Sequence, residues 1–369
     1  MLPNKKGKNI PIIYNNDSLP WININPGPYD YKLFFEGNYY PHSVNLTKLV
    51  FIIRHQSQYF KKVIFLTTGH SFADSMYRSN FGCTIKKTSN LSDLFFVRDN
   101  LFYSIDDGFN DFSLISFGEY NVNEENHLTF LDKQLRITSV YKNPNIKDFE
   151  KEIVVKNGHN TGESFAQAVI DFSYDPFIHT THNKQNYYTF KINGKVVIVN
   201  TSYASGFVMK GKESKITKYN GNPIDSNTQN SHLEYHFLNT IKMFKSHELF
   251  SKYYFDDSIK THFINYSGKN KLTILSLMGD SGSGFFKLAG CQTARFVGIN
   301  ICSCYMIVLT PLEKSNQSNQ MYFDSELEKL VIGQYYIDEI HKASQVLPIG
   351  QIEDYLKNIP GSIIEDITV

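Results

Sequence analysis

The sequence predicts an all-β protein made of antiparallel strands, on two observations. Between residues 49 and 117, short runs rich in β-branched and aromatic residues alternate with clusters of turn-forming residues, a spacing typical of antiparallel barrels. Further along, two such runs over 187–192 and 195–200 are separated by Asn193-Gly194, a pair that strongly favours a tight hairpin turn. Both observations favour short strands joined by short turns.

The first part of the chain is expected to be an extended arm followed by a barrel. Residues 1–46 contain prolines at positions 11, 20, 26 and 28, which exclude a long helix. The segment Tyr141–Asp148, which contains Asn143-Pro144-Asn145, is the expected connection to a second barrel. Strands are expected between the two at Leu49–Arg54, Val63–Thr67, Phe81–Lys86, Leu94–Val97 and Phe112–Phe117.

The second part of the chain combines strands with an insertion. Residues 208–265 do not fit a compact barrel, and apolar residues at helical spacing within His232–Tyr254 predict an amphipathic helix there. The same periodicity predicts helices at Ser325–Leu330 and at Ile349–Ile359, the second of which would cap the barrel. Strands are expected at Glu152–Lys156, Ala168–Phe172, Tyr187–Ile192 and Lys195–Asn200.

The chemistry of the chain is expected to centre on the hexapeptide Gly279-Asp280-Ser281-Gly282-Ser283-Gly284, which follows an apolar run. Glycine adopts backbone angles that other residues avoid, and N–H groups on such a turn can converge on one point, as an oxyanion requires. We therefore interpret Ser281 as a nucleophile and the N–H groups of Gly279 and Ser281 as its oxyanion hole. From the hexapeptide alone, an ordinary loop of glycine and serine remains an alternative.

A serine nucleophile needs a base, and His70 is the candidate. The run Val63–Thr67 is typical of a strand, and the histidine follows at its end. Asp111 begins an alternating apolar run and is the candidate carboxylate behind the histidine. Asp106 and Asp107 lie at a similar distance along the chain, but their surroundings are typical of an exposed turn. Asp111 is preferred because a strand-like run follows it at once.

Together these motifs resemble those of the chymotrypsin-like serine peptidases. Thr67–Ser71 is similar to the histidine motif of that family. The run that begins at Asp111 is similar to its aspartate motif, and the hexapeptide is similar to its nucleophile motif. The three motifs follow one another in the family's chain order. Lys156–Ser164 is similar to a Lys-x-Gly-x-x-Thr-Gly-x-Thr segment of bacterial and fungal members. Phe296–Ile299 and Val308–Leu312 resemble the late strands beside the specificity pocket, so the resemblance spans roughly residues 48 to 314.

The resemblance implies two antiparallel six-stranded β-barrels, and it sets the expected domains. Residues 1–46 would form an N-terminal extension, and residues 47–148 the first barrel with His70 and Asp111. Residues 149–330 would form the second barrel with Ser281 and a partly helical insertion at about 208–265. Residues 331–369 would form a helical tail.

The resemblance further implies a serine endopeptidase that cleaves a polypeptide through an acyl-enzyme on Ser281, without a metal or an organic cofactor. His70 would move the proton, and Asp111 would orient and stabilise the imidazolium. Because a leucine at the pocket floor cannot pair a buried cation, we expect an apolar or small residue before the cut rather than lysine or arginine. The pocket for that residue would be lined by Leu275, which forms its floor, and by Gly298, Ile299 and Asn300.

The resemblance also bears on activation. In animal members, the aspartate before the nucleophile pairs with a new N-terminus that is freed by a proteolytic cut. Asp280 holds that position, but the apolar-apolar-Gly-Gly start of such an N-terminus is absent ahead of Leu49. We therefore expect internal donors to hold Asp280, as in bacterial and viral relatives, and we expect activity without an N-terminal cut.

One alternative is a protein of the same fold that has no catalytic activity. A binding module of the same fold would need no triad, and Ser71, Ala166 and Ser283 depart from the common family pattern. None of these departures removes a reacting group.

Two further alternatives rest on other residues. A lipase-like esterase of the Gly-Asp-Ser type would use Asp338 and His341, but too few residues separate them from Ser281 for an alternating sheet-and-helix domain. His232 and His236 share one helical face and could bind a metal. Their glutamate does not stand where zinc peptidases need it, and no third ligand is evident.

Composition bounds the partners and the location. The formal net charge is +1, which gives no electrostatic argument for nucleic acid or an anionic membrane. No window approaches about 18 consecutive apolar residues, and no apolar block follows the basic N-terminus, so a cytoplasmic location is favoured. The four cysteines fit a reducing compartment. A Cys291–Cys302 bridge and the oligomeric state remain open.

Overall fold

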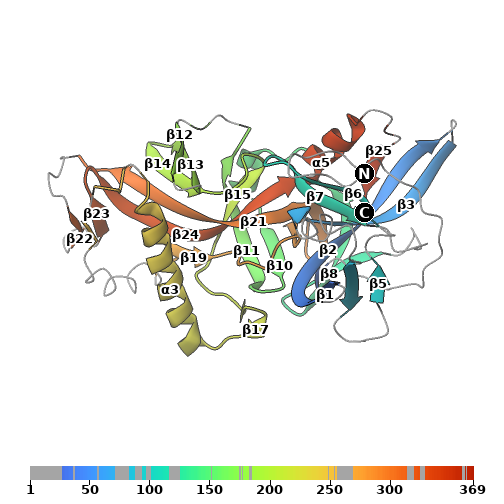
Figure 1. Ribbon diagram of the computed structural model, residues 1–369, viewed down its shortest axis with the longest axis horizontal. Helices are drawn as coiled ribbons and strands as arrows, with labels where there is room; N and C mark the ends of the chain where they lie inside the picture. The colour runs from blue at the N-terminus through green and yellow to red at the C-terminus, as the bar shows by residue number, and fades with distance from the viewer. Residues whose placement is uncertain are drawn as a thin grey trace.

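The computed structural model is a mostly antiparallel β structure, which confirms the predicted class (Figure 1). In the part of the chain that it describes, the strands form an eight-stranded sheet, a fifteen-stranded sheet and a small hairpin, with two α-helices. The residues described are 27–35, 38–55, 58–70, 83–87, 94–96, 101–115, 125–150, 152–173, 176, 178–182, 185–247, 249–252, 254–255, 269–313, 320–324, 329–359, 362 and 364–369.

The first sheet contains the strands expected around His70 and Asp111. Its strand β2 (Asn38–His55) pairs with β3 (Gln58–Thr67), which pairs in turn with β7 (Asp111–Ile115). Over the described residues the sheet is open at both ends, as a half-barrel is. Its spatial order is β5 (Leu94–Phe96), β4 (Cys83–Lys87), β1 (Gly27–Phe35), β2, β3, β7 and β6 (Leu101–Asp106), with β25 (Ile364–Thr368) also on β2.

The second sheet contains six strands whose antiparallel pairings return to their starting point. In order around this ring, they are β10 (Val154–Gly158), β11 (Gly162–Asp171), β15 (Phe207–Gly211), β24 (Tyr335–Pro348), β21 (Thr293–Pro311) and β20 (Gly284–Leu288). Every strand of the ring contributes to one buried apolar cluster, which includes Val154, Ala166, Phe207, Val346, Val297 and Phe285.

Strands β21 and β24 continue beyond the ring and carry an extension of the sheet (Figure 1). The hairpin predicted at Asn193-Gly194 is confirmed, since both residues have positive φ angles of 50° and 76° between two paired strands. The strands beside β21 are β14 (Lys195–Asn200), β13 (Gln185–Ile192) and β12 (Ile178–His182). The strands beside β24 are β23 (Lys329–Ile332), β22 (Gln320–Asp324) and β18 (Tyr254–Phe255).

The predicted amphipathic helix is α3 (Ser226–Phe244), which packs on this extension. It begins earlier than expected because the carboxylate of Asp225 accepts hydrogen bonds from the N–H groups of Asn227 and Thr228, as an N-cap does. Its buried face joins apolar side chains of β21 and β24, and the helical members of that cluster are Leu233, Phe237, Ile241 and Phe244.

The remaining elements are three further strands of the second sheet, the separate small hairpin and two helical segments. The helix α5 (Ile349–Lys357) confirms the helix expected at 349–359. The others are β8 (Asn126–Phe130), β9 (Lys133–Val140), the short 3-10 helix η1 (Ile146–Glu150), β16 (Lys218–Tyr219), β17 (Asn222–Pro223) and β19 (Leu272–Ile274).

Both ends of the chain differ from the expected organisation. Residues 27–46, expected in the arm, form β1 and the start of β2, while 1–26 lie outside the described residues. Residues 331–369 are not mainly helical, because they contain β24 and β25 as well as α5. The helix predicted at Ser325–Leu330 is wrong at its end, because Lys329 and Leu330 lie in β23, and residues 325–328 lie outside the described residues. Nearly every residue of β24 is buried, so it lacks the alternation that reveals a half-exposed strand.

One apolar core joins the two sheets and fixes how they meet. Leu49 of β2, Leu66 of β3 and Phe112 of β7 share this core with Phe296 of β21 and Ile352 of α5. Large buried apolar clusters are the main stabilising contribution to a folded domain. The sheet that carries His70 and the sheet that carries Ser281 are therefore packed against each other through their interiors.

Candidate functional site

The pairing of β3 with β7 brings His70 to Asp111. Thr67 lies opposite Ser113, so the end of β3 meets the beginning of β7. The Nδ1 atom of His70 lies 2.6 Å from Oδ2 of Asp111, and the backbone N–H of His70 donates to Oδ1 at 2.8 Å. The bond to Nδ1 orients the imidazole, and the bond from the backbone N–H holds the carboxylate in place beside it.

The His70–Asp111 pair is buried on one side and open on the other. The Asp111 side chain has 0% of its surface exposed, whereas that of His70 has 37%. Burial disfavours the charged imidazolium, but the hydrogen bond to Asp111 and the negative charges of Asp111 and Asp106 outweigh it, so the pKa of His70 is raised. The histidine can therefore accept a proton more readily than a free imidazole.

The competing carboxylates have other partners. Asp107 accepts hydrogen bonds from the N–H groups of Phe109 and Asn110, which closes an exposed turn between β6 and β7. Asp106 accepts a hydrogen bond from the hydroxyl of Tyr203 at 3.2 Å. The structure thus places Asp111, and not Asp107, against the imidazole.

Ser281 reaches the histidine from the second sheet. Its hydroxyl oxygen lies 3.1 Å from Nε2 of His70, although the two residues are 211 positions apart. The turn around it lies between β19 and β20, and Gly279 and Gly282 have φ angles of +97° and +81°. Such angles favour glycine, so the shape of the turn requires glycine at positions 279 and 282.

The two backbone donors expected for an oxyanion are free of protein partners. Among the described residues, the N–H groups of Gly279 and Ser281 donate to no protein acceptor, whereas those of Asp280, Gly282 and Ser283 do. Free N–H groups beside a nucleophile can hold a developing negative charge.

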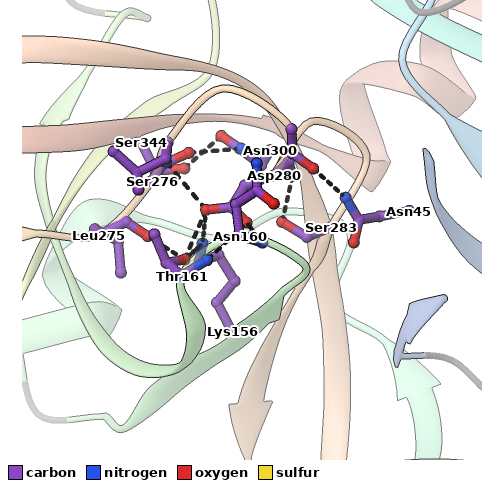
Figure 2. A network of polar contacts seen from close by, with 12 residues as sticks. Asn45, Lys156, Asn160, Thr161, Leu275, Ser276, Asp280, Ser283, Asn300 and Ser344 are labelled. Atoms are coloured by element: carbon purple, nitrogen blue, oxygen red, sulfur yellow. Dashed lines mark hydrogen bonds and ion pairs between the residues drawn. The ribbon is translucent and has the colours of Figure 1, made fainter. Parts of the chain in front are cut away.

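Asp280 is held by five donors from inside the protein, as expected (Figure 2). The Nζ atom of Lys156 lies 2.9 Å from one carboxylate oxygen, and both side chains are fully buried. The hydroxyl and N–H of Thr161 and the N–H groups of Asn160 and Leu277 supply the other four bonds. Burial favours the neutral acid, but the Lys156 charge and these donors outweigh it, so the pKa of Asp280 is lowered.

Sequence reasoning missed three residues that hold this turn. It did not identify Lys156 as the counter-ion of Asp280, although the lysine directly follows two apolar residues, Val154 and Val155, in β10. It assigned no role to Asn160, which donates to the carbonyl of Met278, or to Asn45, which donates to the carbonyls of the turn from β2. Lys156 could have been found from the Lys156–Ser164 segment, which resembles a segment of the family. No feature of the sequence pointed to Asn45.

The pocket residues predicted from the resemblance lie in the interior, which corrects that prediction. Leu275, Gly298, Ile299 and Asn300 are all buried. Leu275 is drawn into the ring because its N–H bonds to β24, and its side chain packs in the ring's apolar cluster. Ile299 packs in the core shared by the sheets, and the amide of Asn300 is bonded to two buried serine hydroxyls. All four residues are thus enclosed by other parts of the chain.

The residues proposed for an esterase or for a metal site have other partners in the structure. His341 is fully buried between Thr273 and Glu339, and Asp338 is paired with Lys195, so neither contacts Ser281. Burial and nearby positive charge lower the pKa of His236 to about 4, and its Nε2 lies 3.0 Å from the hydroxyl of Tyr219.

The histidine, cysteine and acidic side chains bear on possible metal and disulfide sites. In the part of the chain that the structure describes, no three histidine, cysteine or acidic side chains gather as metal ligands. Cys291, Cys302 and Cys304 are free thiols, so the open question of a Cys291–Cys302 bridge is answered in the negative.

Comparison with known proteins does not assign the chain. No protein-family model matches it, and no curated protein is significantly similar to it. Among the helices that the structure describes, none combines the length and the apolar character needed to cross a membrane.

Proposed function

We propose that the protein is a serine endopeptidase of the chymotrypsin-like type, with Ser281 as the nucleophile, His70 as the base and Asp111 as the carboxylate behind it. The observation that carries the proposal is the continuous line of hydrogen bonds from Asp111 through His70 to Ser281. In this interpretation, the ring of six strands is the second barrel of that fold, and the open sheet with His70 is the first.

The chemistry follows from the roles of the three groups. His70 takes the hydroxyl proton as the oxygen of Ser281 attacks the carbonyl carbon of the substrate, and the imidazolium is stabilised by Asp111. The carbonyl oxygen becomes negative, and the free N–H groups of Gly279 and Ser281 stabilise it. His70 then protonates the leaving amine. Water next attacks the acyl carbon while His70 takes its proton, and His70 passes that proton to the oxygen of Ser281 as the acid leaves.

The substrate proposed is a polypeptide, and no preference for the residue before the cut is proposed. The expected preference for an apolar residue rested on Leu275 at the floor of a pocket. Leu275 is enclosed in the core of the ring, so that argument no longer stands. A peptide library cleaved by the full chain would give the preference directly.

Labelling with a fluorophosphonate probe tests the proposed function. The full chain is expected to be labelled at Ser281, and labelling is expected to disappear in Ser281→Ala and in His70→Ala. Because internal donors already hold Asp280, labelling is also expected without removal of any N-terminal fragment, which mass spectrometry of the labelled chain checks. A folded protein that takes no label would favour the binding module without catalysis.

A further inference from the structure

Four successive carbonyl groups in the turn around Ser281 each accept a hydrogen bond from a side chain. Asn160 donates to the carbonyl of Met278, and the hydroxyl of Ser283 donates to that of Asp280 at 2.6 Å. The single amide of Asn45 donates to the carbonyls of Gly279 at 3.0 Å and Ser281 at 2.9 Å. Figure 2 shows most of these side chains converging on the turn from different elements.

Fixing a carbonyl also fixes the N–H group of the same peptide unit. No peptide bond among the described residues is cis, and in a planar trans unit the C=O and N–H groups point in opposite directions. The carbonyl of Met278 belongs to the unit that carries the N–H of Gly279. The carbonyl of Asp280 belongs to the unit that carries the N–H of Ser281. These two N–H groups are the free ones.

We infer that Asn160 and Ser283 are positioning residues that aim the N–H groups of Gly279 and Ser281 at the substrate's oxyanion. The inference rests on the proposed function, because the donors matter only if Ser281 reacts. Asn45 supports both by holding the intervening carbonyls, and it ties the turn to the sheet that carries His70.

Asn160 is well placed for this role because it is itself anchored. Its backbone N–H donates to the carboxylate of Asp280 at 2.7 Å, within the network around Lys156. Its side chain lies directly over Gly279, where a β-carbon on that residue would overlap the Asn160 amide. The N–H of Gly279 is therefore oriented by a side chain that has little freedom to move.

Asn160→Ala is the main test, with the rate of fluorophosphonate labelling as the readout. The phosphonyl oxygen of the probe takes the place of the oxyanion, and loss of one oxyanion donor typically costs about 10²–10³ in rate. Since the substitution disorients the donor without removing it, a fall of about 10–100-fold is expected. Ser283→Ala should cost less, because the N–H of Ser283 still donates to the carbonyl of Asp280 at 3.0 Å.

Asn157→Ala is the matched control. Asn157 lies on β10, shortly before the turn that carries Asn160, and donates its amide to the carbonyl of Thr129 at 3.1 Å, away from the turn around Ser281. Its loss is expected to leave the labelling rate within about twofold of wild type, since the bond it removes lies outside the turn around Ser281.

A second readout distinguishes a change in the orientation of the two N–H donors from a general distortion of the site. In a Ser281→Cys background, iodoacetamide alkylates the thiolate by displacing iodide, and His70 takes the thiol proton. This reaction develops no oxyanion, so Asn160→Ala should leave its rate unchanged.

The outcomes distinguish the inference from the proposed function. Slower fluorophosphonate labelling with unchanged alkylation supports the inference. Equal labelling of Asn160→Ala and wild type overturns it, as does an equal fall in both reactions, which would mean general distortion. If wild type itself is not labelled, it is the proposed function that fails.

Discussion

The two halves of the candidate site are held in different ways. His70 is partly exposed and is oriented by one carboxylate, whereas the turn that carries Ser281 is fixed through a buried Asp280 with five donors. Both aspartates are fully buried. The partner of Asp111 is a histidine, which titrates near neutral pH, and that of Asp280 is a lysine.

This difference shows how buried carboxylates of the same type take different roles. A buried ion pair with further hydrogen bonds is rigid, and removing one partner leaves an uncompensated charge. A buried carboxylate beside an open imidazole instead tunes a group that can gain and lose a proton. We therefore expect substitution of Asp111 to act mainly on rate and pH dependence, and substitution within the Lys156–Asp280 pair to act mainly on stability.

The largest effect is expected from Asp111→Asn. The amide can no longer stabilise the imidazolium or select the correct tautomer, so the rate of labelling at Ser281 should fall by about 10⁴. Labelling kinetics and thermal unfolding should be measured together, with Asp107→Asn as the control because Asp107 only closes an exposed turn. A comparable loss in Asp107→Asn would transfer the role to that residue.

Lys156→Met is expected to have the largest effect on stability. It leaves the buried carboxylate of Asp280 without its counter-ion, which typically costs about 3–5 kcal/mol. Chemical unfolding measures the change. A Lys156→Met variant as stable as wild type would mean that Asp280 does not need the lysine, and that the remaining four donors suffice.

A smaller effect is expected from pH. Since attack needs the neutral imidazole, labelling should fall about tenfold for each pH unit below the pKa of His70. That pKa is raised, so the midpoint should lie above the ordinary value of about 6.5. A midpoint at or below that value would show that the charges of Asp111 and Asp106 do not outweigh the effect of burial on the pKa of His70.

The same shift has the opposite consequence for stability. The folded protein binds the His70 proton more tightly, so this stabilisation is complete below about pH 6.5 and is lost as pH rises through the raised folded pKa. The difference in unfolding free energy between wild type and His70→Gln, measured across this range, should shrink toward alkaline pH.

The smallest effect is expected from Arg54→Ala, which provides the contrast with Lys156. Arg54 and Glu365 form a surface pair at 3.9 Å, with 54% and 43% of their side chains exposed. Exposed pairs contribute about 0–1 kcal/mol. A loss as large as that of Lys156→Met would show that burial is not what distinguishes the two pairs.

The sequence by itself determined the local features of this protein. Strand-forming runs, the Asn193-Gly194 hairpin and the glycines of the turn depend on neighbouring residues and their backbone angles. His70, Asp111 and Ser281 could be identified as candidate site residues because each lies at the edge of a recognisable run of residues. Local propensity and short motifs are sufficient for such predictions.

Only the tertiary structure decided which distant residues meet. The approach of Asn45 to the turn, the pairing of Lys156 with Asp280 and the enclosure of Leu275 depend on how the two sheets pack. The same holds for β24, where burial on both faces removes the periodic pattern that would have marked it as a strand. Contacts between residues more than a hundred positions apart follow from packing and register, and short stretches of sequence do not contain them.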